Sequence, residues 1–172
     1  TETLVGIPTP PGIRENSLRL LGAYGERTLV SGQNLPDQQQ RLLRPEQDAF
    51  VDYPVFLADT LSLVDNNLLT DVRRLNDSTF TALLRVVNDN VLVAVLGRLL
   101  PTKIELTVLQ AFSPTRSRQL FAADDKIVLN LGRPGVSGQE YFVFDHVGAE
   151  ISSVLTERDG RVRGVTTTGF FV

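Results

Sequence analysis

The sequence predicts an all-β domain, and three observations lead to this fold class. Residues 85–112 are mostly aliphatic and rich in Val, whose branched side chain is stiff and favours strands. Turn residues interrupt this apolar segment at residues 88–90 (NDN) and again at Pro101-Thr102. Asp159-Gly160 is a favoured two-residue hairpin turn. Strands separated by turns at such spacing indicate a β-sandwich or a β-barrel.

The apolar segment and the residues just before it divide into three predicted strands. The first, TFTALLRVV, ends at the NDN turn, and the second, VLVAVLGRLL, runs from that turn to Pro101. The third, KIELTVLQAF, places Ile104, Leu106 and Val108 on one side with polar residues between them. A helix over residues 91–100 stays open as the alternative, because periodicity alone does not separate a short buried strand from a helix.

The two ends of the chain differ in character. In the C-terminal half, KIVLNL and EYFVFDHV predict two further strands on either side of the glycine-rich segment GRPGVSG. Near the N-terminus, prolines at positions 8, 10 and 11 preclude a helix and favour extended backbone. We therefore predict an extended arm over residues 1–13 and a β-barrel domain over residues 14–172. Residues 34–50 are polar and predict a long loop, with a short helical turn after Pro45.

Residues 59–75 fit two different structures. Asp59 is a suitable helix N-cap. Apolar residues then recur at helical spacing, which favours one helix, and they are Leu61, Val64, Leu68, Val72 and Leu75. The run of Asp and Asn at residues 65–67 would equally turn a hairpin. The spacing gives the helix a small preference, and both alternatives stay open.

Little in the chain predicts chemistry. The sequence has no cysteine, which excludes disulfides, thiolate metal sites and cysteine nucleophiles. Its one histidine, His146, has no second His or Cys with which to share a metal. The segment GRPGVSG lacks the Lys-Ser/Thr pair of a phosphate-binding loop and is better suited to a turn between strands. We predict no catalytic residue, no cofactor and no metal site, and hence no enzyme.

Charge and hydropathy exclude further classes. A net charge of −3 argues against specific nucleic-acid binding. The N-terminal segment TETLVGIPTPPG predicts no signal peptide, because it has no basic region and no apolar core. The absence of both Cys and Met also fits a thermophilic environment.

The two ends of the chain carry apolar residues that suggest assembly. Terminal segments are usually polar unless they dock onto something. Strand or arm addition to a neighbouring subunit would bury them, and so would packing on their own barrel. The candidate assembly contacts are Leu4, Val5, Ile7, Ile13, Phe170, Phe171 and Val172.

The chain resembles a small major capsid protein. The segments KIELTVLQAF, KIVLNLG and EYFVFDHV, the lack of Cys and Met, and the extended arm carry this resemblance. More specifically, the chain is similar to the smaller of two major capsid proteins in the single β-barrel lineage of membrane-containing icosahedral phages from thermophiles. The resemblance implies an upright jelly roll that assembles with a larger capsid protein over an internal lipid membrane. A helix over residues 59–75 would be a large insert in such a barrel.

The predicted function is therefore that of a structural virion protein. It would associate with itself as a dimer or higher oligomer, co-assemble with the larger capsid protein into an icosahedral shell, and be assembled in the host cytoplasm. The alternative is a β-sandwich that binds a receptor or a carbohydrate, as fibre and adhesin domains do. Sugar sites usually expose aromatic side chains, and this sequence has no Trp and only three Tyr, which disfavours that alternative.

Overall fold

All regular structure is β in this computed structural model, which describes residues 8–37, 40–64, 69–86, 90–123, 125–157, 164–166 and 169–171. For Gln40 and for the last two ranges it describes the backbone alone. The predicted all-β fold class is confirmed. Within these ranges there is no helix, and so none long and apolar enough to cross a membrane.

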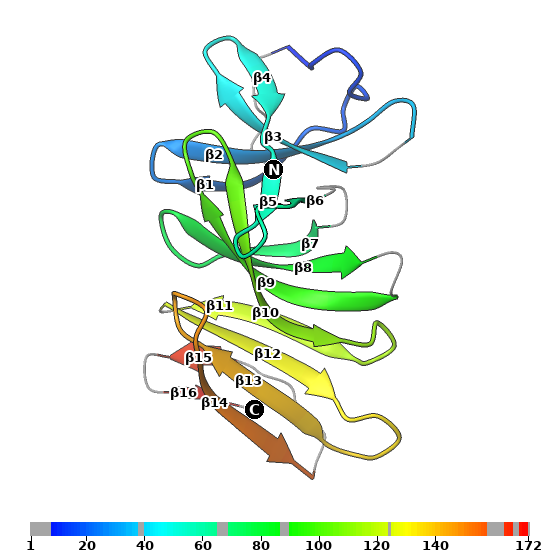
Figure 1. The fold of residues 1–172 in the computed structure, drawn as a ribbon, viewed down its shortest axis with the longest axis vertical. Coiled ribbons are helices and arrows are strands. Elements are labelled where there is room, and N and C mark those ends of the chain that lie inside the picture. Colours follow the sequence, from blue (N-terminus) through cyan, green and yellow to red (C-terminus); the bar gives the residue numbers. More distant parts are fainter. Residues whose placement is uncertain are drawn as a thin grey trace.

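The first of three sheets is an antiparallel meander, shown at the top of Figure 1. Its strands follow the order of the sequence: β1 (Arg19–Tyr24), β2 (Arg27–Gln33), β3 (Gln40–Glu46) and β4 (Ala49–Asp52). The long loop predicted for residues 34–50, with a helical turn after Pro45, is wrong because β3 and β4 occupy most of this range. Leu42, Leu43 and Phe50 are buried there, but too few apolar residues alternate to reveal the strands in the sequence.

The second sheet has the strand order β6-β5-β10-β9-β8-β7. Its strands are β5 (Val55–Leu57), β6 (Leu63–Val64), β7 (Leu69–Arg74), β8 (Thr79–Val86), β9 (Val91–Leu99) and β10 (Ile104–Phe112). The pairing of β5 with β10 is parallel, and the other pairings are antiparallel. The three strands predicted for residues 79–112 are thus β8, β9 and β10, and the helical alternative over residues 91–100 is excluded.

The third sheet is another antiparallel meander. It consists of β11 (Arg118–Ala123), β12 (Lys126–Gly132), β13 (Gln139–Phe144) and β14 (Glu150–Thr156). A short hairpin of β15 (Gly164–Thr166) and β16 (Gly169–Phe171) follows, and β15 lies against β11. The predicted strands KIVLNL and EYFVFDHV correspond to β12 and β13. The hairpin turn predicted at Asp159-Gly160 lies outside the described residues.

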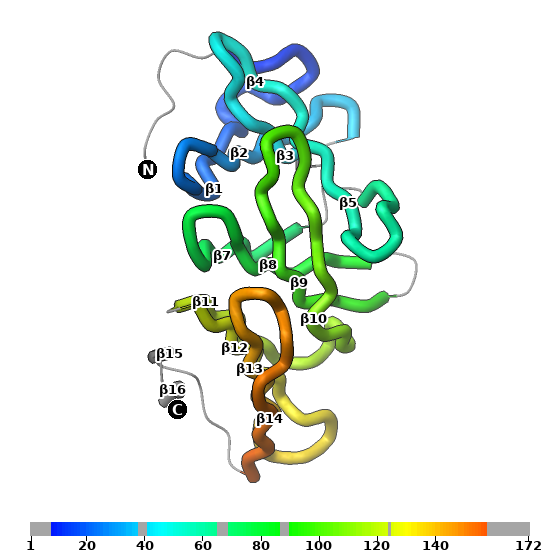
Figure 2. The backbone as a smooth tube through the Cα atoms, turned by 60° about the vertical axis from the view of Figure 1, so that its left-hand side comes forward, coloured from blue at the N-terminus to red at the C-terminus, as the bar shows by residue number. Residues whose placement is uncertain are grey.

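The three sheets form three layers with apolar cores between them (Figure 1). One core cluster joins the first and second sheets and includes Leu29, Leu42, Phe80 and Val95. A second cluster joins the second and third sheets and includes residues from β8 to β13. Figure 2 shows the turn between β9 and β10 reaching up beside the first sheet. There the Tyr53 hydroxyl donates a 2.6 Å hydrogen bond to a carbonyl in that turn.

This layering explains why β9 has no polar side chain from Val91 to Gly97. Val93 and Val95 face the first cluster, while Leu92, Ala94 and Leu96 face the second. A strand with one wet face alternates between apolar and polar residues, but a strand buried on both faces is apolar throughout. The second sheet is therefore the middle layer, and β9 lies at its centre.

A bulge in β10 ends the predicted alternation. Ile104 and Leu106 are buried as expected, but Val108 is 46% exposed. The register with β9 shifts between Val108 and Gln110, and one extra residue moves every later side chain to the opposite face. Phe112 accordingly packs in the second cluster, whereas Ile104 and Leu106 pack in the first.

The helix favoured for residues 59–75 is wrong, and so is the hairpin. The described residues of this segment belong to β6 and β7, which do not pair with each other and form opposite ends of the strand order. Val64 and Val72 both pack against the first cluster. Of the other residues at helical spacing, Leu61 is exposed and Leu75 packs against the second cluster, so the set does not share one face.

The second sheet must be strongly curled. Four residues, 65–68, join the end of β6 to the start of β7, and so short a connection spans at most about 18 Å. The edges of a flat six-stranded sheet would lie about 24 Å apart. Curling brings both edges to the first cluster. The jelly-roll topology itself is not confirmed, because it requires two Greek keys and the described strands pair mainly with their neighbours in sequence.

Two buried tyrosines between the first and second sheets differ in their hydrogen bonding. Burial raises the pKa of the Tyr24 phenol to about 12, although the nearby Arg74 guanidinium acts to lower it. Burial likewise raises the pKa of Tyr53. The Tyr53 hydroxyl is bonded to the carbonyl of Leu100. The Tyr24 hydroxyl has no hydrogen-bond partner among the described residues.

Replacing each tyrosine with phenylalanine should therefore have different effects. Tyr53→Phe leaves a carbonyl unpaired, and we expect it to lower the free energy of unfolding by about 1 kcal/mol. Tyr24→Phe removes a buried hydroxyl that has no bond to lose, so stability should stay unchanged or rise. Urea unfolding of both variants measures the difference. A larger loss for Tyr24→Phe than for Tyr53→Phe would contradict this account.

Candidate functional site

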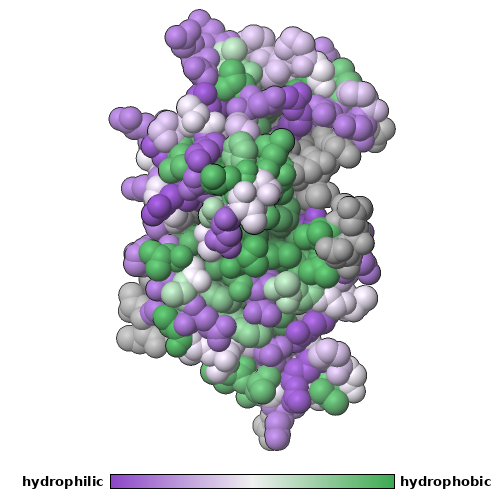
Figure 3. All heavy atoms as spheres, in the orientation of Figure 1, coloured by the Kyte–Doolittle hydropathy of each residue, from purple (hydrophilic) through white to green (hydrophobic). Residues whose placement is uncertain are grey.

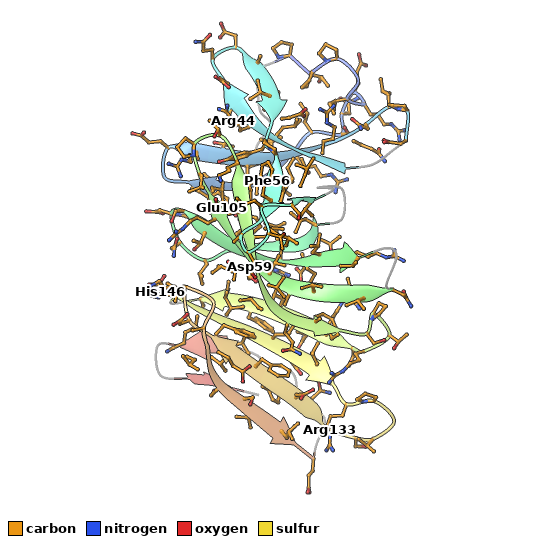
Figure 4. The ribbon with its side chains drawn as sticks, in the orientation of Figure 1. Arg44, Phe56, Asp59, Glu105, Arg133 and His146 are labelled. Atoms are coloured by element: carbon orange, nitrogen blue, oxygen red, sulfur yellow. The ribbon has the colours of Figure 1, made fainter. Side chains whose placement is uncertain are left out.

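The polar side chains of the described residues do not converge on one site. Figure 4 shows labelled charged residues distributed along the molecule, from Arg44 near the top to Arg133 near the bottom. His146 lies exposed in the turn after β13. The carboxylate of Asp145 organises this turn by accepting two backbone N–H bonds, of 3.0 and 2.9 Å. Within the described ranges no three His, Cys, Asp or Glu side chains are grouped as metal ligands.

The glycine-rich segment GRPGVSG forms the turn between β12 and β13, as predicted. The basic segment at residues 113–118 leads into β11, and its Arg116 has a structural role. Arg116 forms a 2.7 Å ion pair with Glu140 of β13 and donates a 2.7 Å hydrogen bond to the carbonyl of Gly132. Its guanidinium therefore ties this loop to the third sheet.

A cleft of about 310 Å³ lies between the edge strands β7 and β11 and is lined partly by Asp71, Arg73 and Arg118. Asp71 has a left-handed φ of 51° at a bulge in β7. Its carboxylate accepts a 2.8 Å hydrogen bond from Nε of Arg73, and Nη1 of Arg118 donates 3.1 Å to the carbonyl of Pro114. The guanidinium groups of Arg73 and Arg118 thus both have partners within the chain. The cleft contains an ion pair at the place where two sheets meet.

Figure 3 shows apolar side chains on the middle of the visible face, over β5, β6 and β10. Exposed apolar residues on these strands and on the loop between β5 and β6 are Leu61, Leu63 and Val108. Leu61 has a left-handed φ of 52°, which is unusual for a bulky residue. A second set of exposed apolar residues lies on β14. The open backbone edge of this strand makes the second set the stronger candidate for an interaction site.

Strand β14 is an exposed edge of the third sheet, at the bottom of Figures 1 and 2. On one side it pairs with β13, and no described strand pairs with its other side. Every second N–H and C=O of such an edge points outward, available to another strand. Its apolar side chains are also exposed: Ile151 by 52%, Val154 by 44% and Leu155 by 65%.

The other edge strands are protected against pairing. Strand β6 has two residues and β4 has four. Both β1 and β7 carry a bulge and arginine side chains, and β11 lies against β7, β8 and β15. Short length, bulges, charges and cover are the usual means of keeping sheet edges from associating. In β14 the charge of Glu150 and the irregularity at Ile151 lie at the start of the strand, and residues 152–156 (SSVLT) carry neither a charge nor a bulge.

The chain holds β14 firmly against β13. Their register is regular from Gln139 opposite Thr156 to Val143 opposite Ser152, and the one irregularity falls at Ile151. The Thr156 hydroxyl accepts a 3.2 Å hydrogen bond from the backbone N–H of Gln139. Gly138 makes close contact with the carbonyl of Thr156. The open edge is therefore part of a well-formed sheet.

Several of the assembly contacts predicted from the sequence lie outside the residues that the structure describes. Leu4, Val5, Ile7 and Val172 lie outside the described residues, and the side chains of Phe170 and Phe171 in β16 are not described. Ile13 is 3% exposed and packs in a core of the first sheet with Val30, Leu43 and Phe50. This residue at the end of the predicted arm packs within its own chain.

Sequence reasoning missed β14 as an interaction site. The signal was present, because residues 151–156 form a strand-length segment without a charge and without strict alternation. A two-sided buried strand has the same features, so the sequence does not distinguish the two.

The chain has no significant similarity to any protein-family model, curated protein or solved structure that was compared with it.

Proposed function

We propose that this protein is a structural subunit that associates with other copies of itself through the exposed edge of β14. One observation carries the proposal. The outer edge of β14 pairs with no described strand, residues 152–156 of that strand carry no charge, and Ile151, Val154 and Leu155 are exposed. Proteins normally protect such an edge, since it is a template for pairing with another chain. An edge left open on an otherwise protected molecule is best explained as a contact surface.

The expected strength of this contact suits assembly into a larger structure. Each cross-strand side-chain pair contributes about 0.2–1 kcal/mol, and each backbone hydrogen bond adds about 0.5–1.5 kcal/mol net. Pairing of one short strand is therefore weak alone. Shells combine several such contacts per subunit, so that weak contacts reinforce one another.

The finer proposal is that the shell is a viral capsid, as the resemblance to the smaller major capsid proteins of membrane-containing phages implies. In that case the chain also contacts a larger capsid protein and faces an internal membrane in the virion. An elongated all-β subunit with apolar residues at exposed positions supports this proposal. A capsid subunit needs several contact surfaces, and the exposed residues Leu61, Leu63 and Val108 offer a second one.

The experiment compares the oligomeric state of two lysine variants. Val154→Lys places a charge at the middle of the open edge, where it should prevent strand pairing. Val136→Lys is the matched control, because Val136 is also an exposed valine, 57% against 44% for Val154, and lies in the turn between β12 and β13. Light scattering over about a hundredfold range of concentration should show association of the unsubstituted chain and of the control, and monomers for Val154→Lys.

Both variants should keep the circular dichroism spectrum of the unsubstituted chain, because both positions are exposed. An unsubstituted chain that stays monomeric over the whole range contradicts self-association. Equal association of Val154→Lys and Val136→Lys contradicts the assignment of β14.

A further inference from the structure

We infer that β14 pairs with β14 of a second copy in antiparallel orientation, about a twofold axis that passes through Val154. This inference rests on the proposed function and names the register of the contact. The occupant is a second copy of this chain because, about this axis, residues 152–156 of the two copies place apolar side chains beside apolar side chains and bring no two like charges together.

The regular part of β14 defines the register. Residues 152–156 pair with β13 without irregularity, and Val154 is their midpoint. An axis at Val154 places Ser152 opposite the partner subunit's Thr156 and Ser153 opposite the partner subunit's Leu155. Each of these pairs lies in the uncharged part of the strand, so no charge is buried by the contact.

The same register buries the apolar side chains of this stretch, on both faces of the joined sheet. Val154 lies directly opposite Val154 of the partner subunit on one face, where opposed Cβ atoms are about 4.5–5.5 Å apart. On the other face, Leu155 is the diagonal neighbour of the partner subunit's Leu155, within reach of a long side chain. The exposed fractions of these residues, 44% and 65%, are the surface that pairing would cover.

Other registers fit less well. An axis at Ser153 would draw Ile151 into the ladder, and Ile151 is the residue at which the register with β13 is irregular. A bulge disrupts regular hydrogen bonding on its strand. Parallel pairing in register would set Glu150 and Glu157 beside their own copies, and adjacent like charges are destabilising. With the axis at Val154, Glu157 lies opposite Ile151 of the partner subunit.

Cysteine cross-linking tests the register directly, because the chain has no cysteine of its own. Only a residue on the twofold axis meets its own copy, so Val154→Cys should form a covalent dimer under mild oxidation. Ser152→Cys is the control, since that position lies four residues from its copy, about 13 Å away. Disulfides need Cα atoms about 4.4–6.8 Å apart. We expect dimer formation on non-reducing gels to be at least about tenfold faster for Val154→Cys.

The possible outcomes separate this inference from the proposed function. If Ser153→Cys cross-links fastest, the axis lies at that residue and the register is overturned. Equal cross-linking of every variant indicates parallel or random contact and also overturns the register. A third outcome is that Val154→Lys abolishes association while no single-cysteine variant forms a cross-link. This outcome overturns the twofold pairing but keeps β14 as the contact. If deletion of residues 1–7 also abolishes that association, the edge binds a neighbour's N-terminal segment. A monomeric unsubstituted chain overturns both proposals.

Discussion

Phe80→Ala is expected to lower the free energy of unfolding by about 3–5 kcal/mol, as large truncations of buried aromatic residues do. Phe80 is fully buried in the cluster between the first and second sheets. Its ring lies opposite Gly97 of β9 and packs edge-on against Tyr24, with centroids 6.1 Å apart. Truncation would leave a cavity where two layers meet. Chemical unfolding followed by circular dichroism measures the loss.

Gly97 supplies a control that tests the same contact from the other side. A Cβ at this position would overlap the ring of Phe80, so Gly97→Ala should cost about 1–3 kcal/mol through overpacking. In the Phe80→Ala background the added methyl group enters the cavity, and its cost should disappear or change sign. The two changes should therefore be clearly non-additive. Strict additivity would show that Gly97 and Phe80 do not share this space.

Gly138→Ala is expected to be the most damaging single change outside the cores. Gly138 has a φ of 115°, a conformation almost confined to glycine, and strain of this kind costs about 1–3 kcal/mol. An added Cβ would also overlap the backbone carbonyl of Thr156 in β14, which is not free to rotate away as a side chain is. We expect the variant to unfold more easily and to lose association together with the edge strand.

Gly135→Ala is the matched control in the same turn. Gly135 also has a left-handed φ, of 69°, but a Cβ there would meet no atom within 4 Å. Its cost should be limited to the backbone preference, about 1–2 kcal/mol, and association should be retained. Unfolding in urea and light scattering measure the two effects. Equal losses for Gly135→Ala and Gly138→Ala would contradict the contact with β14.

The sequence by itself determined the fold class and half of the strands in the second and third sheets. Valine and isoleucine favour strands through their own side-chain torsions, and the Asn, Asp, Pro and Gly residues turn the chain through their own backbone preferences. These are local properties, which explains why β8, β9, β10, β12 and β13 were predicted close to their observed bounds.

Only the tertiary structure decided how these strands are used. Val64 of β6 and Val72 of β7 fit helical spacing although they lie on opposite edges of one curled sheet, because both edges reach the same core. The bulge in β10 changes which core its later residues enter, and no local preference predicts it. Local preferences also do not predict the exposure of β14, since an uncharged apolar strand has the same sequence features whether it lies between two sheets or at an open edge. Burial depends on which neighbours the rest of the chain supplies, and at β14 the described chain supplies a neighbour on one side alone.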